Sequence, residues 1–212
     1  MHLTVRQRAS WLAHLHKAAT KQDHCPLRAL RAPYIPSDAV VVDIGAHAGQ
    51  FSKLFARLAP RGRVYAFEPS SYARSILVPA LKWNWIANVR VLPVGLSDQP
   101  GEMTLHTRIK RSGSLGFGAA YLGADVAPRA RLDERTVPTT LDTFAEGQEL
   151  ERLDFINADV EGWELRALKG GPRRSGPSTQ LCFLRWFTHG WPAPAIGRRT
   201  CSTGSARWAI GR

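Results

Sequence analysis

Apolar residues along this chain occur in two alternating patterns, short unbroken runs and longer stretches with helical spacing. A short run rich in valine and isoleucine is typical of a parallel strand, because such strands are buried on both faces. Apolar residues three and four positions apart predict helices that pack on the sheet. The predicted strands are 39–45, 63–68, 89–94 and 153–158, and the predicted helices are 5–20, 49–58, 72–85 and 163–169. This alternation predicts a doubly wound, mostly parallel α/β sheet.

Several local features refine this prediction. In the first helix, Val5, Leu12, Leu15 and Ala19 lie roughly on one face, which predicts the buried side. Residues 102–107 alternate like an exposed strand. Two further features are a proline at position 79, which argues for a kink or break in the third helix, and a threonine at position 140, which can cap a short helix. The stretch 108–135 is rich in Gly, Ala and Arg with weak periodicity, and we expect a long loop there, a candidate lid.

The first strand leads directly into a glycine-containing turn, where an open α/β sheet binds its ligands. The turn contains Asp43, Gly45, Ala46, His47 and Gly49. A dinucleotide-binding turn needs three glycines, but this chain has a histidine in place of the second and a glutamine in place of the third. The turn therefore suits a ligand with an amino acid portion and no phosphates, such as S-adenosylmethionine, whose ammonium group the Asp43 carboxylate could meet directly or through water. The alternative is a generic strand-to-helix turn.

Two more strand ends carry polar candidates. Glu68 ends the second strand, 23 residues after Gly45, at a position where an acid can accept both ribose hydroxyls of a nucleotide. A solvated glutamate is the alternative. Ser97 and Asp98 follow the third strand, where an adenine ring would lie, although Ser-Asp before Pro-Gly is also ordinary turn chemistry.

Several motifs in this order resemble the FkbM family of S-adenosylmethionine-dependent methyltransferases, which have a Rossmann-like fold. The motifs are Val41-Val42-Asp43-Ile44-Gly45-Ala46-His47-Ala48-Gly49-Gln50-Phe51, Ala66-Phe67-Glu68-Pro69, Asn88-Val89, Val94-Gly95-Leu96-Ser97-Asp98, Thr139-Thr140-Leu141-Asp142 and Asp159-Val160-Glu161-Gly162-Trp163-Glu164. The resemblance implies O-methylation of a hydroxyl on a sugar, polyketide or glycolipid. It also implies that Asp43, Gly45, Gly49 and Glu68 hold the cofactor.

The resemblance places Asp159 and Glu161 at the transferring methyl group or the acceptor hydroxyl. Methyl transfer to an alcohol needs a base near the O–H group, and two carboxylates could supply it or bind a divalent cation that acidifies the hydroxyl. On an extended chain these two residues share one face, whereas on a helix they do not. The alternative is a helix N-terminus with favourable acids. The family usually has a lysine where this chain has Asn157, which puts any local salt bridge in doubt.

The net charge of +12 is unevenly distributed. Residues 171–212 hold seven arginines and no acid, whereas residues 1–170 hold 22 basic and 17 acidic side chains. We expect a frameshift near codon 171, because Arg-, Gly-, Pro- and Trp-rich text is typical of a GC-rich gene read out of frame. The sheet would then be incomplete at its C-terminal edge, and this truncation could leave the enzyme inactive. A genuine basic tail for an acidic partner is the alternative.

The expected organisation is a helix with an irregular lead-in (1–37), a cofactor-binding domain (38–171) and an atypical basic tail (172–212), which an out-of-frame origin would leave disordered. The partner of the enzyme would be a small-molecule or glycan hydroxyl, with no specific nucleic acid. Two competing functions are a non-catalytic module that binds nucleic acid or an anionic surface through the tail, and a nicotinamide-dependent oxidoreductase, which the histidine in the turn disfavours. Three scattered cysteines and no long apolar run predict a cytoplasmic protein with neither a metal site nor a membrane span.

Overall fold

The structure of this chain is a computed structural model. It describes residues 4–21, 27–109, 115–122, 131–160, 162–171, 181–184, 196–200 and 207–210.

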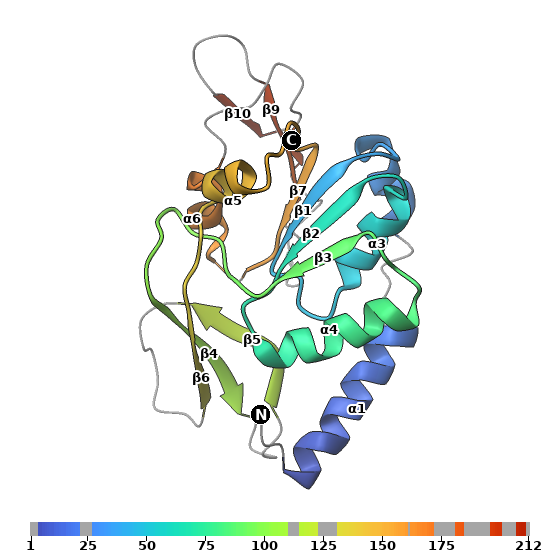
Figure 1. Cartoon of the computed structure of the whole chain (residues 1–212), viewed down its shortest axis with the longest axis vertical. Coiled ribbons are helices and arrows are strands. Elements are labelled where there is room, and N and C mark those ends of the chain that lie inside the picture. The colour runs from blue at the N-terminus through green and yellow to red at the C-terminus, as the bar shows by residue number, and fades with distance from the viewer. Residues whose placement is uncertain are drawn as a thin grey trace.

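A four-stranded parallel sheet forms the centre of the fold (Figure 1). Its strands are β1 (Val40–Ile44), β2 (Arg63–Phe67), β3 (Val89–Leu92) and β7 (Phe155–Ala158), in the order β3-β2-β1-β7. All three ladders are parallel. The predicted α/β class and the four predicted strands are confirmed.

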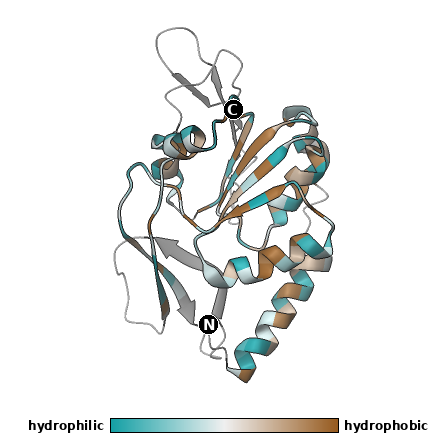
Figure 2. Cartoon of the chain, viewed as in Figure 1, coloured by the Kyte–Doolittle hydropathy of each residue, from teal (hydrophilic) through white to brown (hydrophobic). Residues whose placement is uncertain are grey.

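Helices cover both faces of this sheet, because neighbouring residues of each strand point to opposite sides. Val41 and Val64 pack with α3 (Gln50–Leu58), and α4 (Ser71–Trp83) lies over the same face. On the other face, Val42 and Tyr65 pack with α5 (Leu141–Gly147) and α6 (Glu164–Lys169). Figure 2 shows the apolar colour concentrated on the strands between these layers. The α4 helix continues through Pro79, so the break suggested by the sequence does not occur.

The N-terminal helix α1 (Val5–Thr20) begins with a capping box between Thr4 and Gln7 and packs on α4. Its buried side differs in part from the predicted one, since Leu15 packs there as predicted, whereas Val5 is 83% and Leu12 60% exposed. The packed residues are Trp11, Leu15 and Ala18. The small Ala18 side chain lets the two helices approach each other, and the Trp11 Nε1–H donates to Ser75 Oγ at 2.9 Å. The lead-in continues through α2 (Arg28–Arg31) and the 3₁₀ turn η2 (Ala32–Tyr34).

A second sheet lies between β3 and α5 in the sequence. Its antiparallel strands are β4 (Met103–Ile109), β5 (Leu115–Leu122) and β6 (Arg131–Thr136), in the order β5-β4-β6. The prediction of a long loop over 108–135 is therefore wrong for both outer strands. Strands pair through their backbone groups and need no regular alternation of apolar and polar side chains. The weak periodicity of the sequence therefore gave no sign of these strands. The strand predicted at 102–107 is confirmed as β4, but its predicted exposure is wrong, because β4 is central and its Leu105, His106 and Thr107 are buried.

A third, antiparallel sheet consists of β8 (Leu181–Leu184), β9 (Ile196–Thr200) and β10 (Arg207–Ile210). Strand β8 pairs with β9 and lies beside β7. The side of the parallel sheet that the sequence predicts to be open thus has a strand next to it. Within the described part of the chain, that strand belongs to the β8–β10 sheet. The remaining residues of the predicted tail lie outside the described residues, so a frameshift near codon 171 stays a prediction.

Candidate active site

The carboxyl ends of three neighbouring strands bring the main candidates to one edge of the sheet. Ile44 of β1 is in register with Phe67 of β2 and with Ala158 of β7. The residue after each strand therefore lies at the same level. These residues are Gly45, Glu68 and Asp159.

The β1–α3 turn is held tightly to the ends of its neighbours. The backbone N–H groups of Gly45 and Ala46 both donate to Phe67 O, at 2.9 and 3.0 Å. Gly45 has a φ of +80°, and a Cβ on it would lie 2.3 Å from Asp159 O, so only glycine fits here. A Cβ on Gly49, at φ +81°, would lie 2.4 Å from Leu77 Cδ1 of α4. Both glycines are thus explained by packing of the turn against protein.

Asp43 lies at the base of the turn and is 1% exposed. One carboxylate oxygen accepts from Ser52 Oγ at 2.5 Å and the other from Asn157 Nδ2 at 2.8 Å. Burial raises the pKa of Asp43 to about 6, and the nearby charge of Asp159 adds to the increase, against the opposing effect of the two hydrogen bonds. At neutral pH the turn therefore encloses a fixed negative charge that has no cationic partner among these contacts.

Glu68 connects the end of β2 to the turn. Its Oε2 accepts the backbone N–H of His47 at 2.7 Å, and its Oε1 accepts that of Ser70 at 2.9 Å. The side chain is buried, which raises the pKa of Glu68 to about 7, although both N–H bonds and the charge of Arg74 favour the ionised form. Each carboxylate oxygen has two lone pairs, so both can accept a further hydrogen bond.

His47 occupies the place of the second glycine of a dinucleotide turn, at φ +50°. Burial lowers the pKa of His47 to about 4, outweighing a hydrogen bond with Gln50. The imidazole is therefore neutral at physiological pH and brings no positive charge to the turn. Since Glu68 already accepts the backbone N–H of His47, this amide is not available to a phosphate, which agrees with the prediction against pyrophosphate.

Ser97 and Asp98 form a turn that is anchored to the segments beside α5 and α6. Ser97 is 3% exposed, and its Oγ donates to Asp98 Oδ1 at 3.0 Å. Its backbone N–H donates to Thr139 O, and a Cβ on Gly170 would lie 2.2 Å from Ser97 O. The structure thus fixes this turn against the start of α5 and the end of α6. A place for adenine there stays a prediction.

Asp159 is exposed at the end of β7, where its backbone N–H donates to Ile44 O at 3.0 Å. The residue lies in the connection between β7 and α6, which begins at Glu164. Its predicted partner Glu161 lies outside the described residues. Among the residues that the structure describes, no group of three His, Cys, Asp or Glu side chains could hold a metal ion. The divalent cation considered from the sequence stays untested.

Sequence reasoning missed the residues that hold the candidates in place. Asn157 is the amide partner of Asp43 and is its register partner across β1 and β7. A polar residue in each of two adjacent, otherwise apolar strands was the signal for this contact. Glu134 of β6 accepts the backbone N–H of Ser71 at 2.8 Å, one residue past the amide that Glu68 accepts. No local signal marks Glu134, because its partner is 63 residues away in the sequence.

No helix in the described part of the chain is long and apolar enough to cross a membrane.

Comparisons with known proteins identify the family. The family model of the FkbM methyltransferase domain matches residues 43–183. The methyltransferase sdnD of Sordaria araneosa is 30% identical over 177 residues, which cover 70% of this chain and 64% of that protein. The 2-O-methyltransferase NoeI of Sinorhizobium fredii is 28% identical over 152 residues, covering 63% of this chain and 58% of that protein.

The chain thus spans less than two thirds of either curated relative. A solved structure of methyltransferase FkbM from Methylobacillus flagellatus is 16% identical, with a TM-score of 0.44, and covers 85% of this chain and 48% of that one. The family match begins at Asp43 and includes the turn, Glu68, Ser97, Asp98 and Asp159. This chain belongs to the FkbM methyltransferase domain family.

Proposed function

We propose that this chain binds S-adenosylmethionine and transfers its methyl group to a hydroxyl of a sugar, polyketide or glycolipid. One observation carries the cofactor proposal. The Glu68 carboxylate, at the place of a ribose-binding acid, also accepts the backbone N–H of His47 in the β1–α3 turn at 2.7 Å. The turn and the acid are therefore one hydrogen-bonded unit, which is preorganised for a nucleoside with an amino acid portion.

The chemistry of the donor set fits this cofactor. Glu68 keeps free lone pairs on two oxygens, which match the two adjacent ribose hydroxyls. Gly45, Ala46 and Gly49 keep the backbone of the turn close to the sheet edge. Both carboxylate oxygens of Asp43 already accept hydrogen bonds, from Ser52 and Asn157. Its negative charge would therefore attract the cationic cofactor from within the turn, and a water molecule would bridge the carboxylate and the cofactor. The turn presents no side-chain cation, which agrees with a ligand that has no phosphates.

S-adenosylmethionine, when bound, supplies a methyl group on a positively charged sulfur. The chain would need to orient the acceptor oxygen in line with that group and to take up the hydroxyl proton. Asp159 is our candidate for the base, because it lies exposed at the same sheet edge as Gly45 and Glu68. We assign Glu161 the same region on the family motif alone. The Ser97–Asp98 turn is our candidate wall for the adenine ring.

Calorimetry tests the cofactor step with S-adenosylmethionine and NAD as ligands. We expect binding of the first and none of the second. Glu68→Gln should weaken binding by about tenfold or more, because hydrogen bonds to a charged acceptor contribute about 1.5–3 kcal/mol each. The matched control Glu102→Gln changes an exposed acid of the loop before β4 and should bind normally. Binding of NAD in place of S-adenosylmethionine would overturn the proposal.

Transfer of a labelled methyl group to a panel of sugar and glycolipid hydroxyls tests the chemical step. We expect Asp159→Asn to lower kcat and to leave the Kd for S-adenosylmethionine unchanged. A general base typically contributes about 10²–10⁴-fold to the rate. If Asp159→Asn turned over at the wild-type rate, the assignment of Asp159 as the base would be wrong, while the cofactor proposal would stand.

A further inference from the structure

Two tryptophans at the end of α4 point into solvent. Trp83 is 70% and Trp85 94% exposed, although tryptophan is usually among the most buried residues of a domain. Trp85 has a φ of +55° because it is the left-handed residue that ends α4: its backbone N–H donates to Lys82 O and that of Ile86 donates to Leu81 O, both at 3.1 Å. Two large apolar side chains exposed this close together are typical of a contact surface rather than of a core.

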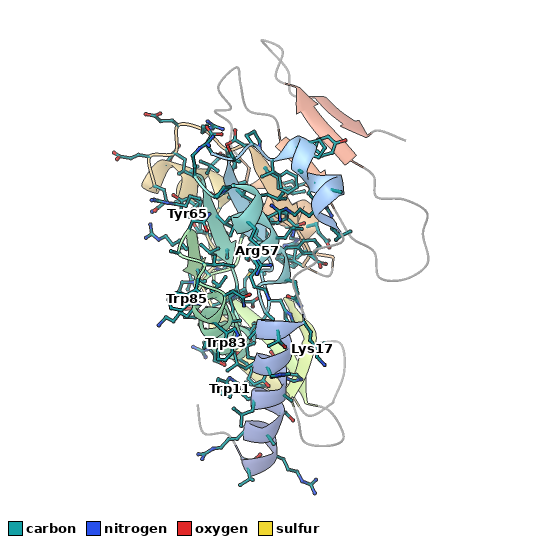
Figure 3. All side chains as sticks on the ribbon, turned by 90° about the vertical axis from the view of Figure 1, so that its right-hand side faces the viewer. Trp11, Lys17, Arg57, Tyr65, Trp83 and Trp85 are labelled. Carbon is teal, nitrogen blue, oxygen red and sulfur yellow. The ribbon has the colours of Figure 1, made fainter. Side chains whose placement is uncertain are left out.

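Two hydrogen bonds tie the residue between these tryptophans to two other helices. Asn84, which lies between them, accepts a hydrogen bond from Arg57 Nη2 of α3 at 2.9 Å. The Nδ2 of Asn84 donates to Ala19 O near the end of α1, at 3.0 Å. These two bonds bring the basic ends of α1 and α3 to the tryptophans. Figure 3 looks onto α1, with Trp83 and Trp85 on one side of this helix, Lys17 on its other side and Arg57 above its end. We define the Trp83–Trp85 surface as Lys17, Lys21, Arg57, Lys82, Trp83 and Trp85, all of which are exposed.

The helices that form this surface carry no acidic residue. The sequences of α1, α3 and α4 contain neither Asp nor Glu. These three helices therefore contribute only positive charge to the surface. Their charge is independent of the arginines of residues 171–212.

We propose that the Trp83–Trp85 surface binds an anionic lipid bilayer. Tryptophan prefers the membrane–water interface, because its ring is apolar and its N–H still reaches polar groups. Lysine and arginine around it bind the negative headgroups of such a membrane. The inference goes beyond methyl transfer and does not depend on it.

Sedimentation of the full chain with vesicles tests the proposal. The vesicles are pure phosphatidylcholine, or phosphatidylcholine with about 30% phosphatidylserine. We expect binding to the anionic vesicles and its loss at high salt. The double variant Trp83→Ala, Trp85→Ala should bind about tenfold or more weakly, because two large apolar side chains no longer insert. The pair Lys17→Gln, Lys82→Gln should lose about fivefold per charge.

Charge-matched controls separate the surface from general basicity. Arg135→Gln with Lys169→Gln removes two exposed cations outside the surface and should change binding little. Equal losses for both charge pairs would overturn the proposal, as would wild-type binding to neutral vesicles only. Absence of binding to the anionic vesicles would also overturn it. Another partner would then be indicated if the tryptophan variant bound single-stranded RNA more weakly, or if light scattering showed that it no longer self-associates. Vesicle binding is measured without cofactor or acceptor, so its failure leaves the proposed methyl transfer untouched.

Discussion

Replacement of Asp43 by asparagine is expected to stabilise this protein at neutral pH. The carboxylate of Asp43 is buried, accepts from Ser52 and Asn157, and has a pKa raised from 3.8 to about 6. An amide of the same shape can keep both contacts, since its oxygen accepts from Asn157 and its nitrogen donates to the Ser52 hydroxyl. One pKa unit corresponds to about 1.4 kcal/mol, so burial of the charge costs about 3 kcal/mol at high pH.

The pH dependence of this gain follows from the sign of the shift. A raised folded-state pKa means that the protonated carboxyl favours folding. This contribution of Asp43 is complete below pH 3.8 and is lost as the pH rises through about 6. Asp43→Asn never carries the charge. Its advantage in unfolding free energy should therefore be about 3 kcal/mol at pH 8, about half of that at pH 5, and below about 1 kcal/mol at pH 4.

Urea unfolding of wild type and Asp43→Asn at these three pH values measures the difference. Asp38→Asn is the matched control, because Asp38 is exposed and its pKa is lowered by its own backbone hydrogen bond and by Arg152. This control should gain no stability at pH 8. An advantage of Asp43→Asn that did not change with pH, or a loss of stability at pH 8, would refute the reasoning. Calorimetry on the same variant should show weaker binding of S-adenosylmethionine, which would make Asp43 a residue kept for function at the expense of stability.

Two further substitutions test the packing of the site. Gly45→Ala should lower the unfolding free energy by more than about 2 kcal/mol in a urea titration, because it combines a positive φ with a Cβ placed 2.3 Å from Asp159 O. Gly147→Ala, where a Cβ meets nothing within 4 Å, is the control and should not destabilise. Glu134→Ala should cost about 1 kcal/mol, since Ser71 at the start of α4 loses its acceptor. A thermal scan should show the loss, and Glu134→Gln, which keeps an acceptor oxygen, should recover most of it.

The parallel sheet could be predicted because its strands are short apolar runs bounded by Gly, Pro and acidic residues. The antiparallel strands β5 and β6 could not, because their pairing with β4 is made by the backbone. The buried side of α1 was misassigned because helical spacing gives more than one apolar stripe. The stripe with Trp11 and Ala18 is the one that packs on α4, and the sequence of α1 alone does not show these contacts.

The candidate site was predictable where one residue's chemistry matches its place at a strand end, as for Asp43 and Glu68. Their hydrogen-bond partners were not, since Asn157 and Glu134 come from distant strands.

The frameshift expected near codon 171 is open to a direct check. Nucleotide sequencing of codons 165–175 should reveal a frame that restores a glutamate-bearing strand downstream, and its absence would remove the idea.

The distance in sequence between β1 and β7 has a consequence for the order of folding. Strands β1, β2 and β3 lie within residues 40–92, so their pairing closes only short loops. Asp43 and Asn157 are 114 residues apart, and their strands must close a much longer one. We therefore expect β7 to dock late on a preformed β1–β3 unit. Because this docking buries the Asp43 carboxylate, refolding should be faster near pH 5 than at pH 8, and Asp43→Asn should abolish that difference.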